Sequence, residues 1–99
     1  MNLSFKTKLW EYNGKGSWYF VTLPRRDAEV IREISPKARG FGSIRVTAQI
    51  GKSIWQTSIF PDTKSKSYLL PVKKEVRRVN NLSDGAIVEV TLKIYEPLA

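Results

Sequence analysis

The stretch YFVTLP, residues 19–24, indicates the architecture of the chain because a related stretch, YLLP, occurs again at residues 68–71. Each is followed by a short amphipathic segment and then by a valine-rich run, so residues 19–50 and 68–94 form two similar units. Corresponding dipeptides lie 44 to 47 residues apart: Leu23-Pro24 with Leu70-Pro71, Glu29-Val30 with Glu75-Val76, and Val46-Thr47 with Val90-Thr91. Two such units predict a compact, pseudo-symmetric body, since an open-ended solenoid normally needs about three repeats.

Alternation of apolar and polar residues predicts strands within and around these units. Residues 3–11, for example, place Leu3, Phe5 and Leu9 on one face and lysines on the other. Asn13-Gly14 and Gly51-Lys52 have the residues preferred in two-residue hairpin turns of type I′ and type II′. The sequence therefore predicts six strands, over residues 3–11, 17–23, 43–50, 53–60, 67–70 and 86–94.

Prolines indicate where strands stop and helices begin. Pro24 suits the first turn of a helix that Pro36 ends, and its expected apolar side is Ala28, Ile31 and Ile34. Pro61 is expected to end the fourth strand. Pro71 is expected to begin a second helix, with an apolar stripe of Val72, Val76 and Val79 and an outer face of Lys73, Lys74, Arg77 and Arg78.

Two short helices hide too little area to cover both faces of an open six-stranded sheet. Closing the sheet removes its exposed edges. The repeated order of strand, helix and strand also favours interlocked halves. We therefore predict one mainly β domain over residues 1–99, a closed or nearly closed six-stranded barrel of double-psi-like type with two short helices.

Composition excludes several classes of function. The chain has no histidine and no cysteine, which excludes histidine- and thiol-based catalytic groups and ordinary zinc sites. We predict no metal, no cofactor and no catalytic residue, and an enzyme is the last of the alternatives. No apolar run approaches the roughly 20 residues of a membrane span, and residues 1–10 lack the apolar centre of a signal peptide. We expect a cytoplasmic protein with no membrane partner.

The charge of the chain favours an anionic ligand. Lysine and arginine number 17 against 9 acidic residues, a net charge of +8. Both expected helices open with basic pairs, although the partial positive charge of a helix N-terminus ordinarily favours acidic residues. Free N–H groups beside cations suit a phosphate, sulfate or carboxylate. We predict a non-catalytic module that binds a small anion of this kind through Arg25, Arg26, Arg39, Ser58, Lys73, Lys74 and Arg77.

Two other functions stay open at this point. A nucleic-acid-binding barrel would use the basic surface, with Trp10, Trp18 and Trp55 as platforms for bases. Tryptophans in a small barrel more often serve packing. An accessory domain for protein contacts would instead expose an apolar patch of several hundred Å².

Four segments of the chain carry a family resemblance, and together they span most of its length. They are FVTLP at residues 20–24, RGFGS at 39–43, WQTSIFPD at 55–62 and YLLPVKK at 68–74, the last followed by Val76-Arg77. In these segments the chain resembles domain-of-unknown-function family 1905. The resemblance implies a small β-barrel domain of bacterial type, found alone or joined to a domain similar to the YdeI/OmpD-associated proteins. It implies no established activity.

Overall fold

The structure is a computed structural model that describes residues 1–12, 18–34 and 42–95. Six strands and two helices follow one another in the chain. They are β1 (Asn2–Glu11), β2 (Tyr19–Thr22), α1 (Arg25–Ile34), β3 (Ile44–Ile50), β4 (Ser53–Asp62), β5 (Ser67–Pro71), α2 (Lys74–Val79) and β6 (Ile87–Ile94). No helix in the described part of the chain is long and apolar enough to cross a membrane.

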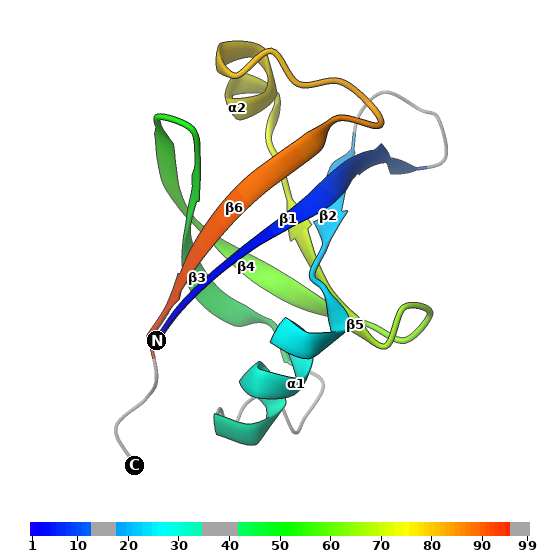
Figure 1. Ribbon diagram of the computed structural model, residues 1–99, viewed down its shortest axis with the longest axis vertical. Coiled ribbons are helices and arrows are strands. Elements are labelled where there is room, and N and C mark those ends of the chain that lie inside the picture. The colour runs from blue at the N-terminus through cyan, green and yellow to red at the C-terminus, as the bar shows by residue number, and fades with distance from the viewer. Residues whose placement is uncertain (13–17, 35–41, 96–99) are drawn as a thin grey trace.

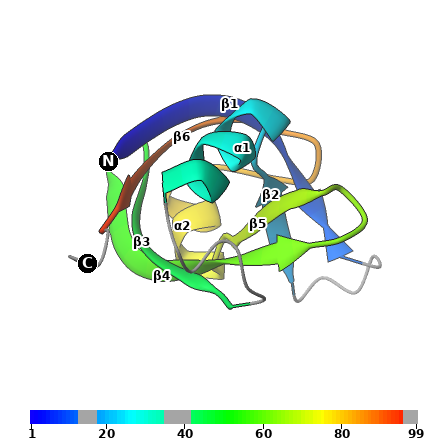
Figure 2. The same cartoon turned by 90° about the horizontal axis from the view of Figure 1, so that it is seen from below.

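The strands close into a barrel in the order β1-β2-β5-β4-β3-β6, and β6 returns to β1. All six pairings are antiparallel. The two helices lie at opposite ends of this barrel, with α2 at the top and α1 at the bottom of Figure 1. Figure 2, the view from below, shows α1 over the near end with α2 behind it. The predicted closed six-stranded barrel with two short helices is thus confirmed.

The order of the strands has the symmetry that the repeat predicts. Exchanging the first three strands with the last three leaves every neighbour relation in the barrel unchanged. Each half supplies one strand to each central pair, since β2 lies beside β5 and β3 beside β6. The two halves therefore share their ladders, and neither half contains a complete sheet.

Inward residues of all six strands fill the barrel with aliphatic side chains. Leu9, Val21, Ile59, Leu70 and Val90 are fully buried, one from each of five strands.

The turn between β3 and β4, at the α2 end of the barrel, has the conformation that the sequence predicts. Gly51 has a φ of +57° and Lys52 has no positive φ, as the predicted type II′ turn requires.

Pro61 was predicted to end a strand and Pro71 to begin a helix, and in both cases the structure differs. Strand β4 continues through Pro61 to Asp62, and β5 includes Pro71, so that α2 begins only at Lys74. Each proline has a strand neighbour on one side only, because β3 does not extend beside Pro61 and β4 does not pair with Pro71. A proline in such a position removes no ladder hydrogen bond, so the strand can run through it.

The predicted stripe of the second helix is also partly wrong. Val76 is buried with 3% of its surface exposed, whereas Val79 is 55% exposed. The later start of α2 leaves it only 6 residues, and Val72 belongs to the segment before it. The predicted Asn13-Gly14 turn and the helix end at Pro36 lie outside the described residues.

Candidate functional site

Strands β4 and β5 separate at the α2 end of the barrel. Their ladder ends where Phe60 pairs with Leu69, although β4 extends back to Ser53. Continuing the same register would place Thr57 opposite Val72 and Trp55 opposite Lys74. Strand β5 instead stays beside β2, the Val72 amide donates to the Tyr19 carbonyl at 2.9 Å, and the chain turns into α2.

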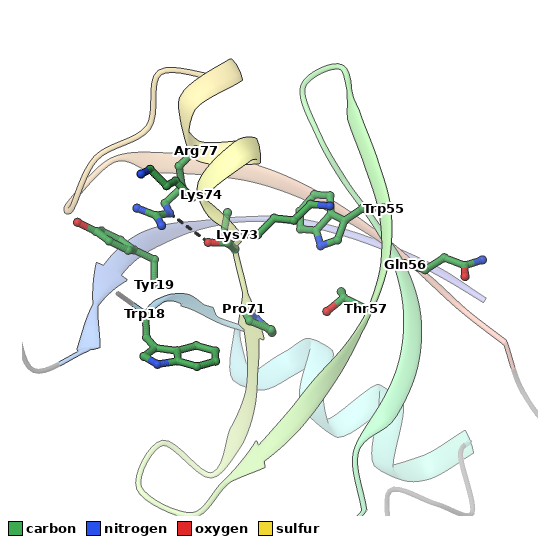
Figure 3. A pocket seen from close by; sticks show the side chains of 10 residues that line it. Trp18, Tyr19, Trp55, Gln56, Thr57, Pro71, Lys73, Lys74 and Arg77 are labelled. Atoms are coloured by element: carbon green, nitrogen blue, oxygen red, sulfur yellow. Dashed lines mark hydrogen bonds between the residues drawn. The ribbon is translucent and has the colours of Figure 1, made fainter. Parts of the chain in front are cut away.

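A cavity of about 590 Å³ lies where this ladder would have continued. Its walls come from the start of β2, the middle of β4 and the segment that runs from the end of β5 into α2 (Figure 3). The lining residues are Trp18, Tyr19, Trp55, Gln56, Thr57, Pro71, Val72, Lys73, Lys74 and Arg77. We call this the α2 cavity. It is lined by three cations and no carboxylate among the described residues.

Arg77 is the cation that the surrounding structure orients. Its guanidinium carbon lies 3.9 Å from the centroid of the Tyr19 ring, and its Nε donates to the Val72 carbonyl at 3.2 Å (Figure 3). Contact with the ring face restrains the position of the guanidinium, and the Nε bond restrains its rotation. The two terminal nitrogens have no hydrogen-bond partner among the described residues.

Lys73 and Lys74 supply two further charges at the rim of the cavity. Both side chains are exposed, and in the described part of the chain neither forms an ion pair with a carboxylate. Lysine is a mobile point charge, whereas arginine offers a planar fork of donors. The α2 cavity thus combines one oriented donor with two adjustable cations.

Two indoles lie on either side of the α2 cavity, with Pro71 between them (Figure 3). Trp55, from β4, is half-buried and packs against the barrel core. Trp18 is 60% exposed, and its ring lies nearly parallel to that of Phe20, with 6.2 Å between centroids. Trp10 is different, because its Nε1 donates to the Thr22 hydroxyl at 3.0 Å and holds β1 to β2.

The structure brings together three of the seven predicted binding residues. Lys73, Lys74 and Arg77 line the α2 cavity. Arg25 and Arg26 are exposed on α1, at the other end of the barrel, and Ser58 lies on β4 without lining this cavity. Arg39 lies outside the described residues.

Tyr19, Gln56, Thr57 and Pro71 also line the α2 cavity and were not predicted as site residues. Their participation depends on where β4 and β5 separate, which no local pattern indicates. The tryptophans were recognised as possible platforms, but alternation along a strand cannot tell a rim from a core position. No group of His, Cys, Asp or Glu among the described residues could hold a metal ion.

A family model fits the chain across the barrel and both helices. No curated protein is similar enough to the chain to count as a match. The family model, described as "Domain of unknown function (DUF1905)", matches residues 5–92, which covers most of the 99 residues. Of the structural elements only the beginning of β1 and the end of β6 fall outside the match. The chain therefore belongs to the DUF1905 family.

Proposed function

We propose that the α2 cavity binds a small organic anion that carries both a phosphate or carboxylate group and a planar apolar part. The observation that carries the proposal is the oriented guanidinium of Arg77, stacked on Tyr19 with its terminal nitrogens free among the described residues. Two such nitrogens can form a bidentate pair with a phosphate or carboxylate. A nucleoside phosphate is the simplest ligand that meets both requirements.

The chemistry of the lining divides the ligand into two parts. Lys73, Lys74 and Arg77 would contact the anionic group, and each hydrogen bond to a charged group contributes about 1.5–3 kcal/mol. Trp18 and Trp55 would contact the planar part, where stacking on an aromatic ring contributes about 1–3 kcal/mol. The described lining offers cations and aromatic rings but no carboxylate, which favours a binding role over catalysis. The proposed place of action is the cytoplasm.

Thermal unfolding with added ligand tests this proposal. Phosphate, sulfate and uridine monophosphate would be titrated at fixed ionic strength, because interactions between exposed charges of the protein weaken as the salt concentration rises and would change its stability by themselves. A ligand at ten times its Kd stabilises the folded state by about 1.4 kcal/mol, which raises Tm by several degrees in a domain of this size. We expect saturable stabilisation, largest with uridine monophosphate.

Two double variants with equal loss of charge locate the effect. Lys73→Ala/Lys74→Ala removes two cations of the α2 cavity, whereas Arg25→Ala/Arg26→Ala removes two from α1. The first variant should lose most of the stabilisation and the second should keep it. Equal responses in both variants, or none in the unsubstituted protein, would disprove the proposal.

A further inference from the structure

The α2 cavity is the middle one of three adjoining hollows. On one side it shares Trp18 with a hollow of about 280 Å³ lined by Tyr12, Trp18 and Phe20. On the other side it shares Lys74 and Arg77 with a hollow of about 400 Å³ that also reaches Arg78. We call these the aromatic hollow and the basic hollow. A ligand that fills only the α2 cavity leaves both of them empty.

The aromatic hollow exposes ring faces to solvent. Trp18 lies nearly parallel to Phe20, and the Tyr12 ring stands edge-on to Phe20 at 6.2 Å between centroids. Tyr12 and Trp18 are both exposed. Ring faces at a surface offer stacking sites for any unpaired base, because every base has a π-face.

The basic hollow continues the positive charge of the α2 cavity across α2. The three hollows together are lined by four cations, Lys73, Lys74, Arg77 and Arg78, and by no acidic residue among those described. Glu75, the acidic residue of α2, is exposed but lines none of them. An extended anion can therefore follow this surface without meeting a like charge in its walls.

We infer that the ligand is a short single strand of nucleic acid, whose phosphates lie along α2 and whose bases stack on the aromatic hollow and on the indoles of the α2 cavity. This inference rests on the proposed function, because it makes the bound anion one nucleotide of a strand. Duplexes keep their base faces covered, so a site built on exposed rings selects unpaired bases. An acidic peptide could use the four cations, but it would need aromatic side chains at the right spacing to stack on the rings, whereas every nucleotide of a strand carries a planar base.

Fluorescence anisotropy with a labelled octauridylate tests the inference on the whole chain, with uridine monophosphate as competitor. We expect the octamer to bind at least about tenfold more tightly than the monophosphate, since it also fills the flanking hollows. The logarithm of its binding constant should fall with log salt with a slope of about −2 to −3, as three to four contacted phosphates on a single strand require. A duplex of equal length should bind more weakly.

Substitutions outside the α2 cavity separate the inference from the proposed function. Tyr12→Ala and Arg78→Ala should each weaken octamer binding about three- to tenfold and leave monophosphate binding unchanged. Arg25→Ala, on α1, is the matched control for Arg78→Ala and should affect neither ligand. Circular dichroism melts would establish that each variant is folded.

The outcomes that overturn the inference are distinct from those that overturn the proposed function. If uridine monophosphate binds and the octamer binds no more tightly, the inference fails and the proposed function stands. Octamer binding that Arg25→Ala weakens as much as Arg78→Ala, or that polyglutamate displaces equally well, would also overturn the inference. If neither nucleotide ligand binds, both fail together.

Discussion

At each end of the barrel a helix places an arginine over a tyrosine that belongs to the other half of the repeat. Arg32 of α1 lies over Tyr68 of β5 at 5.7 Å, and Arg77 of α2 lies over Tyr19 of β2 at 3.9 Å. The surroundings of the two pairs differ. Tyr68 is buried, with 2% of its surface exposed, and Arg32 also donates to the Lys66 carbonyl at 2.6 Å. At the α1 end, the arginine thus ties a helix to a hairpin, whereas the terminal nitrogens of Arg77 have no hydrogen-bond partner among the described residues.

The difference begins with Val72 and Lys73, which lie between Pro71 and the start of the helix in the second unit, whereas no residue separates Pro24 from α1. Helix α1 starts directly after Pro24 and has 10 residues, of which Asp27, Ala28 and Ile31 are buried. Helix α2 starts three residues after Pro71 and has 6 residues, of which Val76 is buried. A shorter helix covers less of its end of the barrel, and the α2 cavity is the space left beside it.

The α1 end contains a buried carboxyl group with an oxygen that is unpaired in the described part of the chain, and the residue that precedes the helix explains why this oxygen has no partner. Asp27 is buried, and its Oδ2 has no hydrogen-bond partner among the described residues. Asp27 is the third residue of α1, a position from which a Glu or Gln side chain commonly accepts a hydrogen bond from the backbone N–H of the N-cap residue. Here the N-cap residue is Pro24, which has no N–H. The lost capping bond leaves this oxygen without its usual donor.

Cutting the chain between residues 51 and 52 should lower its stability most, because each half of the barrel depends on ladders that it forms with the other half. Fragment 1–51 keeps only the β1–β2 ladder, and fragment 52–99 keeps only the β4–β5 ladder. Each of these ladders consists of three residue pairs. We expect each fragment alone to be unfolded or aggregated, as measured by circular dichroism and urea titration. A monomeric fragment with a cooperative melt would contradict the interlocked barrel.

Packing under α2 gives the next largest effect. Val76→Ala removes two methyl groups from a buried site and should lower the free energy of unfolding by about 1–3 kcal/mol. Val79→Ala, one turn further along the same helix, is the matched control and should change it by less than about 0.5 kcal/mol. Equal losses in urea denaturation would mean that Val79 is buried as well, and that the short α2 covers more of the barrel than we describe.

The two arginines provide the most direct test of the comparison. Arg32→Ala and Arg77→Ala each remove one cation–π contact and one hydrogen bond, and each should lower the free energy of unfolding by about 1 kcal/mol. Only Arg77→Ala should abolish stabilisation by uridine monophosphate. Arg77→Lys, which keeps the charge but loses the planar fork, should bind with intermediate affinity.

The pKa of Tyr68 provides a second readout of the α1 end in the same two arginine variants. Burial raises the pKa of its phenol above the ordinary value, and the charge of Arg32 partly offsets this rise. Arg32→Ala should therefore move the alkaline absorbance titration of Tyr68 to higher pH, while Arg77→Ala leaves it unchanged. An unchanged titration in Arg32→Ala would contradict the contact between Arg32 and Tyr68 that distinguishes the α1 end.

The sequence predicts the fold of this protein more completely than its candidate site. Alternation in residues 44–50 and 87–94 predicts inward faces correctly, because burial in a closed barrel has a period of two. The paired LeuPro motifs predict the repeat but place the start of α2 three residues too early, since local rules do not reveal that Pro71 has a one-sided neighbour. The α2 cavity depends on that start and on where β4 leaves β5. Lys73, Lys74 and Arg77 could be proposed from charge alone, whereas Tyr19 and Thr57 required the topology.

The smallest expected effect concerns the hairpin that receives Arg32. Asp62 Oδ2 accepts hydrogen bonds from the Ser65 hydroxyl at 2.6 Å and from the Ser65 amide at 3.0 Å. The turn leads to Lys66, whose φ is +58° and whose carbonyl is the acceptor for Arg32. The Ser65 hydroxyl has the largest effect on the pKa of Asp62 and holds it below its ordinary value. Burial is the next largest effect and opposes this, while the backbone hydrogen bonds of the turn and the charge of Lys64 add to the lowering.

A carboxyl group whose pKa is lower in the folded state stabilises the protein at pH values above its unfolded pKa. That contribution begins to decline as the pH falls to the unfolded pKa, about pH 4, and is lost as the pH falls further through the lower folded pKa. Ser65→Ala should remove part of it, about 0.5 kcal/mol at pH 7 and less at pH 3, because the turn is largely solvated. Melts at pH 3, 4, 5 and 7, with Ser53→Ala in the other long hairpin as the comparison, would measure this. A loss from Ser65→Ala that is the same at pH 3 and pH 7 would show that the hydroxyl does not act through the Asp62 carboxylate, and that the turn leading to the Arg32 acceptor is held by its backbone alone.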